Sequence, residues 1–381
     1  MTEQQPTMRK TRFVCVSDTH NASPNGAFKL PKGDVLIHAG DMTNQGSISE
    51  LRKTVKWVEE ADFEAKIVIA GNHDITLDSG FYAQYGSYFH NQHPQDPAEC
   101  QQLLEQSASI RWLRHESATI KLDSPTGPRT TFKIFGSPLS PENGMWAFRY
   151  RPEEAVHVWD QIPLDSDIVM THTPPKYHCD ETGQRRSAGC ESLRNALWRV
   201  RPRLAICGHV HEGRGADRVR WDLRSSNLKY KEESVQRWED PGRDNKKMSL
   251  IDLTSKGSNA LDNDGSNGEI VESSPTLSTS QAPIVPVVNL QQRSSNVAIS
   301  RIATNLLALP AETLPAATRG HGGCPPSLRC DLEALSGRLG RRETCIINAA
   351  IMTSSWPHGS GGGKRYNKPI VVDIDLPVWG E

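Results

Sequence analysis

The feature that most constrains this chain is a series of short apolar runs that each end abruptly in polar residues or glycine. The runs are rich in Val and Ile and are separated by longer mixed segments. They are Phe13–Val16, Val35–Ile37, Lys66–Ala70, Thr131–Phe135, Ile168–Thr171 and Leu204–Cys207. Runs of this length and composition are typical of buried β-strands. A chain with this pattern is expected to fold around a buried sheet.

Helical patterns lie between several of these runs. Residues 47–50 (Ser-Ile-Ser-Glu) have the form of a capping box, in which Ser and Glu satisfy the first N–H groups of a helix. Apolar residues then follow on one helical face at Ile48, Leu51, Val55 and Val58. A second helix is predicted through Leu193, Leu197 and Val200, ending before Pro202. Residues 119–122 and 131–135 favour a hairpin. The alternation of strand and helix predicts a layered α/β domain.

The composition changes after about residue 224. Residues 225–340 are rich in Ser, Asn, Asp, Gln and Pro, and we predict a low-complexity, largely disordered insertion, with Ile302–Leu309 as an apolar exception. Thr344–Ile351 and Pro369–Leu376 favour strands that pair back onto the first part of the chain. The predicted domain therefore comprises residues 11–224 plus 341–381. The glycine-rich segment 359–364 lacks the spacing of a phosphate-binding loop, so a flexible loop is expected.

Bulk composition narrows the range of partners and compartments. The 381 residues carry a formal net charge of -1, so the chain has no long-range basic field to attract nucleic acid. The polar first residues lack the apolar segment of a secretory signal, and no run approaches the ~20 apolar residues that span a bilayer. We expect a soluble, cytoplasmic protein without a membrane partner. The eight cysteines show no disulfide or zinc pattern, and Cys15 and Cys207 are predicted to be buried thiols.

Ligand-type side chains follow five of the strand-like runs. These side chains are Asp18 and His20, Asp41, Asn72 with His73 and Asp74, His172, and finally His209 and His211. In open α/β sheets, ligands bind at the carboxyl edge of the strands. Each block alone has an ordinary interpretation, such as a structural histidine or an Asn-Gly turn. Five blocks in order, each after a strand, instead predict one site.

The kinds of side chain indicate a metal centre. Asp, His and Asn without Cys suit Mn, Fe or Zn better than Ca or a structural zinc. Seven such residues are too many for one ion, whereas a shared carboxylate lets them serve two ions. Two ions about 3.5–4 Å apart can activate a bridging hydroxide and neutralise phosphoryl oxygens during in-line attack.

The same blocks resemble the signature of the calcineurin-like metallophosphoesterase superfamily. They are Asp18-x-His20, Gly40-Asp41, Gly71-Asn72-His73-Asp74, His172 and Gly208-His209-x-His211. Further phrases, such as Thr171-His-Thr-Pro-Pro175, the strand with Asn348-Ala349, and Asn367-Lys-Pro-Ile-Val371, are similar to the metallophosphoesterase-domain-containing (brain 239-like) group and its fungal members. The resemblance implies a β-sandwich flanked by helices, with four layers in the order α/β/β/α.

The resemblance also implies a role for each residue. Asp18, His20 and His211 would hold one ion, and Asn72, His172 and His209 would hold the other. Asp41 would bridge the two ions. His73 would face the phosphate as a catalytic residue rather than a ligand. Asp74 would orient the His73 ring, with a turn carboxylate as its alternative role.

We therefore expect a metal-dependent phosphoesterase acting on a small phosphoester. The resemblance favours phosphodiesters, with cyclic nucleotides among the candidates. The alternatives are a non-catalytic metal-binding scaffold whose insertion recruits protein partners, and a nuclease, which the charge disfavours. Trp146 and Phe148 are candidates for lining the cleft, although core packing is the favoured interpretation. The remaining histidines, at 38, 90, 93, 115, 157, 178, 321 and 358, are expected to be structural or exposed.

Overall fold

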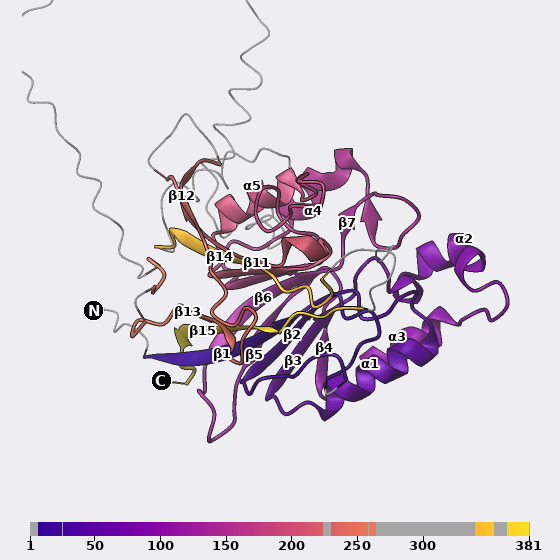
Figure 1. Cartoon of the computed structure of the whole chain (residues 1–381), viewed down its shortest axis with the longest axis horizontal. Coiled ribbons are helices and arrows are strands. Elements are labelled where there is room, and N and C mark those ends of the chain that lie inside the picture. The colour runs from indigo at the N-terminus through magenta and orange to yellow at the C-terminus, as the bar shows by residue number, and fades with distance from the viewer. Residues whose placement is uncertain are drawn as a thin grey trace, which may run out of the picture.

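Two β-sheets packed face to face form the centre of the molecule (Figure 1). The computed structural model describes residues 7–24, 26–223, 230–257, 259–263, 340–353 and 364–380. Phe13 and Ile67 of one sheet and Ile134 and Ile206 of the other meet in the core between them, each at most 1% exposed. Burial of this shared apolar surface is the main force that holds the two sheets together.

The first sheet has six strands in the order β13-β15-β1-β2-β3-β4. These strands are β1 (Met8–Val16), β2 (Val35–Ala39), β3 (Ala65–Ile69), β4 (Ile110–Trp112), β13 (Ser249–Asp252) and β15 (Ile370–Pro377). β1 to β4 run parallel, and β15 lies antiparallel to β1, with Met8 opposite Pro377. Because parallel strands end on the same side, the loops after β1, β2 and β3 meet at one edge.

The second sheet has seven strands in the order β12-β11-β14-β10-β9-β6-β5. These strands are β5 (Glu116–Lys121), β6 (Thr131–Ser137), β9 (Ile168–Thr171), β10 (Leu204–Cys207), β11 (Gly215–Trp221), β12 (Glu232–Arg237) and β14 (Glu343–Asn348). β6, β9, β10 and β14 run parallel, while β5, β11 and β12 are antiparallel to their neighbours. The outer strands thus turn a parallel centre into a mixed sheet.

Helices cover the outer face of each sheet. α1 (Ile48–Glu60) and α3 (Pro97–Glu105) pack on the first sheet, and α4 (Ala155–Asp160) and α5 (Glu191–Val200) pack on the second. The other short elements are α2 (Ser79–Phe89), the β7–β8 pair (Ser140–Pro141 and Arg149–Tyr150) and the single turns η1 (Ile75–Leu77), η2 (Pro152–Glu154) and η3 (His211–Gly213). The order helix, sheet, sheet, helix confirms the predicted four-layer α/β/β/α fold.

The strands and helices predicted from the sequence are present. All six apolar runs lie in strands, residues 119–121 and 131–135 form the β5–β6 hairpin, and Ser47 and Glu50 close the predicted capping box on α1. The tail strands β14 and β15 pair with β10 and β1, as expected. The six cysteines within the described residues are free and buried, Cys15 and Cys207 among them.

One boundary differs from the sequence-based interpretation. β12 and β13 lie within residues 225–340, where an insertion was predicted, yet they hydrogen-bond to β11 and β15. β12 has the exposed, polar sequence of an edge strand, which gives no apolar alternation to detect. Residues 264–339, including Ile302–Leu309, and residues 354–363, which include all of the glycine-rich segment 359–364 except Lys364, lie outside the described residues. The division into a domain and an insertion stays a prediction there.

Candidate metal centre

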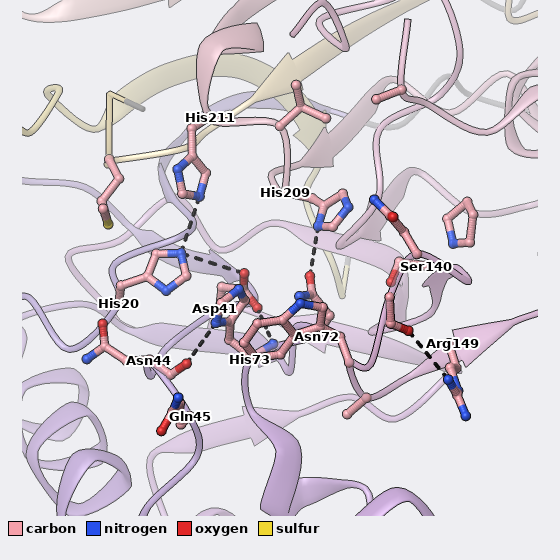
Figure 2. A pocket seen from close by; sticks show the side chains of 18 of the residues that line it. His20, Asp41, Asn44, Gln45, Asn72, His73, Ser140, Arg149, His209 and His211 are labelled. Atoms are coloured by element: carbon pink, nitrogen blue, oxygen red, sulfur yellow. Dashed lines mark hydrogen bonds and ion pairs between the residues drawn. The ribbon is translucent and has the colours of Figure 1, made fainter. Parts of the chain in front are cut away.

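The predicted ligand residues lie together where the carboxyl ends of five strands meet. Asp18, Asp41 and Asn72 follow β1, β2 and β3 of the first sheet, whereas His172 and His209 follow β9 and β10 of the second. Figure 2 shows side chains from both sheets pointing toward one another across the mouth of the sandwich. The site therefore exists only when the two sheets are packed together.

One group of ligand-type atoms is formed by Asp18, His20 and His211. Nε2 of His211 lies 3.3 Å from Oδ1 of Asp18 and 3.2 Å from Nε2 of His20. Nδ1 of His20 is 3.1 Å from the carbonyl oxygen of Thr43, which accepts a hydrogen bond. A carbonyl that accepts from Nδ1 leaves the lone pair on Nε2, directed at the group.

A second group is formed by Asp41, His172 and His209, with Asn72 between them. Nε2 of His172 lies 3.3 Å from Oδ1 of Asp41 and 2.9 Å from Oδ1 of Asn72. Nδ1 of His209 lies 2.8 Å from the same Asn72 oxygen.

Asp41 lies between the two groups. Its Oδ1 faces His172 of the second group, and its Oδ2 is 3.7 Å from Nε2 of His20 in the first. A carboxylate with one oxygen toward each group has the placement that a bridging ligand requires.

The hydrogen bonds of His172 test whether this arrangement suits a cation. Its Nδ1 lies 2.9 Å from the carbonyl oxygen of Ala39, so Nδ1 carries the proton and Nε2 the lone pair in the neutral ring. That lone pair faces the oxygens of Asp41 and Asn72, which also bear lone pairs. Three such atoms in contact repel one another unless a cation lies among them. The residues therefore fit a divalent metal ion with nitrogen and oxygen ligands.

The electrostatics agree with this assignment. Burial raises the pKa of Asp18, but the hydrogen bond and charge of His211 outweigh it and lower that pKa to about 2. Burial lowers the pKa of His20 and of His209 to about 4. Burial also opposes protonation of His172, yet the charge of Asp41 raises that pKa to about 9. Ionised Asp and neutral His are the forms that bind metals. At His172, a proton and a metal ion would compete for the same nitrogen, Nε2.

The backbone of the site adopts conformations that side chains seldom tolerate. Asp18, His20, Asp41 and His209 have positive φ angles of 52°, 42°, 54° and 67°. Such left-handed residues cost free energy and are concentrated at functional sites. Gly208 allows its backbone to lie directly against Ser17 and Asp18, because a Cβ at this position would collide with both side chains.

His73 lies at the site, but Asp74 does not contact its ring as expected. Nδ1 of His73 is 2.7 Å from the carbonyl oxygen of Asn44. The buried Asp74 carboxylate instead accepts hydrogen bonds from the backbone N–H groups of Met42, Thr43 and Gly71. The expected role of Asp74 is therefore corrected: it holds together the loops after β2 and β3. The sequence favoured a contact between His73 and Asp74 because they are adjacent, whereas the turn points their side chains in different directions.

Sequence reasoning missed the importance of two further residues, Asn348 and Asn44, and favoured core packing for Trp146. Trp146 does pack, partly buried, against the cluster of Ile75, Phe81 and Ala147, and it also stacks on the His73 ring with centroids 3.8 Å apart and lines the site. Asn348, at the end of β14, donates its amide N–H groups to the carbonyls of Cys179 and Val210, which holds the loop bearing His209 and His211. Asn44 supplies the carbonyl that contacts His73. A motif search could have found only Asn348, which lies in a phrase already noted.

The ligand residues open into a cavity of about 860 Å³. Its wall includes His20, Asp41, Asn72, His73, His209 and His211, together with Phe89, Pro141, Trp146 and Met352 on the apolar side. Of the remaining histidines, His38, His90, His115 and His178 bond elsewhere, His93 and His157 lie outside the cavity lining, and 321 and 358 fall outside the described residues.

The sequence matches a known protein family. The model of the calcineurin-like phosphoesterase family matches residues 11–213, more than half of the sequence. This chain belongs to that family. The match spans the strands that carry every predicted ligand, and the phosphoesterase signature thus coincides with the geometric site. Within the described residues, no helix is long and apolar enough to cross a membrane.

Several curated relatives align with about half of this chain. Metallophosphoesterase domain-containing protein 1 of Homo sapiens is 38% identical over 212 residues, covering 54% of this chain and 62% of that protein. A UPF0046 protein of Caenorhabditis elegans is 34% identical over 218 residues, covering 54% and 70%. A probable rhamnogalacturonate lyase C of Emericella nidulans is 40% identical over 214 residues, covering 56% of this chain but 18% of that protein. The chain thus spans less than two thirds of the human protein and of the Emericella protein.

Proposed function

We propose that this chain hydrolyses phosphoesters with two bound metal ions, and that it prefers phosphodiesters to monoesters. The observation that carries the proposal is the meeting of seven ligand-type side chains in overlapping groups, in which Asp41 lies with His172 and His209 on one side and with His20 and His73 on the other. Family membership supplies the reaction class. Manganese, iron and zinc all suit the donor atoms.

The chain's own residues have distinct tasks in this proposal. Asp18, His20 and His211 hold one ion, Asn72, His172 and His209 hold the other, and Asp41 serves both. Two ions so placed supply a nucleophilic hydroxide at neutral pH and neutralise charge on the phosphoryl oxygens. The left-handed backbone at four of these positions helps to hold the ligands in place.

His73 acts on the substrate rather than on the metals. The carbonyl oxygen of Asn44 accepts a hydrogen bond from Nδ1–H, so Nε2 is the ring nitrogen available to the cavity. In the imidazolium form, which also carries a proton on Nε2, His73 donates a hydrogen bond to the phosphoryl group or transfers that proton to the departing oxygen and is left as the neutral ring. The stacked Trp146 ring restricts how far His73 can turn.

The shape of the cavity supports the preference for diesters. A monoester needs room for one organic group, whereas a diester needs room for two. The 860 Å³ cavity offers an apolar wall of Phe89, Pro141 and Trp146 beside the ligand residues. Cyclic nucleotides, whose bases stack on aromatic side chains, are candidates within this class.

Metal analysis and an assay with two aryl esters test the proposal. Metal-loaded protein is expected to bind two ions per chain and to hydrolyse bis-p-nitrophenyl phosphate faster than p-nitrophenyl phosphate. His73→Ala should keep both ions but lose roughly 100-fold or more in kcat, the scale of acid–base catalysis. Asp41→Asn should lose metal and activity together, because the bridge is removed.

His90→Ala is the matched control, since His90 bonds to Tyr82 outside the cavity. Unchanged turnover in His73→Ala would refute the role of His73. A protein that holds two ions but hydrolyses neither ester would favour the scaffold alternative.

A further inference from the structure

A second, smaller cavity of about 310 Å³ lies next to the metal-ligand groups. It shares His20, Asn44 and Lys364 with the large cavity, so these three residues form a ridge between the two. Its other polar lining residues are Asn21, Ser23, Lys53 and Tyr366. Among the described residues that line it, none is Asp or Glu.

The two lysines make this cavity positive. Nζ of Lys364 lies 3.2 Å from Oδ1 of Asn44 and 3.5 Å from the carbonyl oxygen of His20. Nζ of Lys53, on α1, lies 2.7 Å from the carbonyl oxygen of Asn21. Among the described residues, neither ammonium forms an ion pair with a carboxylate, and both side chains are exposed, so both are accessible to an anionic ligand. Arg149, the cationic residue across the large cavity, is already paired with Glu142 at 3.0 Å.

The ridge connects this cavity to the reacting centre. Asn44 contacts Lys364 through its side chain and His73 through its carbonyl oxygen. Figure 2 shows Asn44 beside His20 and His73, away from Arg149. A group that extends from the metal ligands past Asn44 therefore enters the smaller cavity, toward the lysines.

We propose that the smaller cavity is a subsite for a second anionic group, a phosphate or carboxylate, on the substrate whose phosphoester lies at the metals. The inference rests on the proposed function and narrows its substrate class. Ammonium groups are the usual partners of a bound oxyanion. The amide NH2 of Asn44 already donates to Glu50 at 2.6 Å, so the two lysines are the groups that would hold the anion. Lys53 lies within the matched family residues 11–213 and Lys364 outside them, so part of this selectivity comes from the tail.

Calorimetry with small phosphonates tests the subsite without requiring turnover. The manganese-loaded chain is titrated with methylphosphonate, which reaches only the metals. It is then titrated with 3-phosphonopropionate, 4-phosphonobutyrate and propane-1,3-bisphosphonate, which add a second anion. We expect at least one of the longer ligands to bind about tenfold or more tightly than methylphosphonate, the scale of one charged hydrogen bond. Which anion binds more tightly distinguishes carboxylate from phosphate.

Three lysine variants complete the test. Lys53→Met and Lys364→Met should each reduce the advantage to less than about threefold and leave methylphosphonate affinity unchanged. Lys56→Met is the control, because Lys56 is on the same helix, 74% exposed and close to Glu60. Equal wild-type affinities for all ligands, or equal loss for short and long ligands in Lys364→Met, would overturn the subsite. An advantage that persists in a protein without esterase activity would refute the proposed function alone.

Discussion

At the scale of single residues, Trp146 positions the proposed catalytic side chain His73 by stacking on its ring. The backbone N–H of Ala147 donates to the carbonyl of Asn72 at 3.2 Å, and that of Phe148 donates to Asp78 at 2.9 Å. These bonds hold the loop so that Trp146 lies against His73. The indole thus positions the histidine from a segment about 70 residues away in the chain.

Replacing Trp146 should therefore lower turnover without affecting the metals. Trp146→Ala removes the surface on which the His73 ring rests, and we expect kcat to fall roughly ten- to a hundredfold, because small misplacements of catalytic groups are costly. Trp146→Phe should retain most of the activity because it keeps a flat aromatic face. Steady-state kinetics with metal analysis decides: a fall in metal content, or a rise in KM with kcat unchanged, would contradict the positioning role.

The ligand residues themselves could be predicted because each follows an apolar run directly. Asp18, His172 and His209 needed only the rule that parallel strands end on one side. Trp146, Asn44 and Lys364 could not be predicted in the same way. Their places depend on loop paths and on pairings between distant segments, and a sequence pattern carries no such information. Asp74 shows the opposite error, since adjacency in sequence suggested a contact that the turn prevents.

At the scale of elements, a buried ionic cluster attaches the edge strand β12 to the molecule. Nε2 of His178 lies 3.0 Å from Glu232 of β12, and its Nδ1 lies 3.4 Å from Asp217 of β11. Nε of Arg194 on α5 donates to the same Glu232 at 2.8 Å. The cluster replaces the apolar contacts that the exposed sequence of β12 lacks, which also explains why the strand was not predicted.

This cluster should make stability depend on pH. Burial lowers the pKa of His178, but hydrogen bonds to Asp217 and Glu232 raise it overall. Burial raises the pKa of Glu232, but His178 lowers it overall. The raised histidine stabilises below about pH 6.5 and loses its effect at higher pH, whereas the lowered glutamate stabilises above about pH 4.5. The stabilisation is therefore fullest between these values.

Comparison of the wild type with His178→Gln measures this contribution. The difference in unfolding free energy between the two should be larger at pH 5.5 than at pH 8.5. Titrations elsewhere affect both proteins and cancel in the difference. Urea denaturation at the two pH values provides the measurement, and a pH-independent difference would show that folding does not raise the pKa of His178.

At the scale of the whole molecule, the tail is part of the core rather than an appendage. β15 lies between β1 and β13, and Ile370 is fully buried between the two sheets. Ile370→Ala should destabilise the fold by about 2–5 kcal/mol, through lost burial and the cavity left behind. Val235→Ala, at a side chain 47% exposed, should change stability by no more than about 0.5 kcal/mol.

Urea unfolding followed by both fluorescence and circular dichroism checks this prediction. The two probes should report one shared transition, because β15 contributes to the same core as β1. An unchanged midpoint in Ile370→Ala would mean that the tail does not contribute to cooperative folding. The four-layer fold was predictable from pattern and resemblance, but the order of strands around β15 followed only from the register.

The antiparallel pairing of β1 with β15 also has a practical meaning. Met8 lies opposite Pro377, so both of these positions lie at the side of the sheet opposite the carboxyl ends of β1 to β3, where the ligand residues gather. A fusion partner, affinity handle or surface linkage attached next to either residue would therefore lie on the side of the molecule opposite the ligand residues. The mouth of the large cavity would then face away from such an attachment and stay open to solvent.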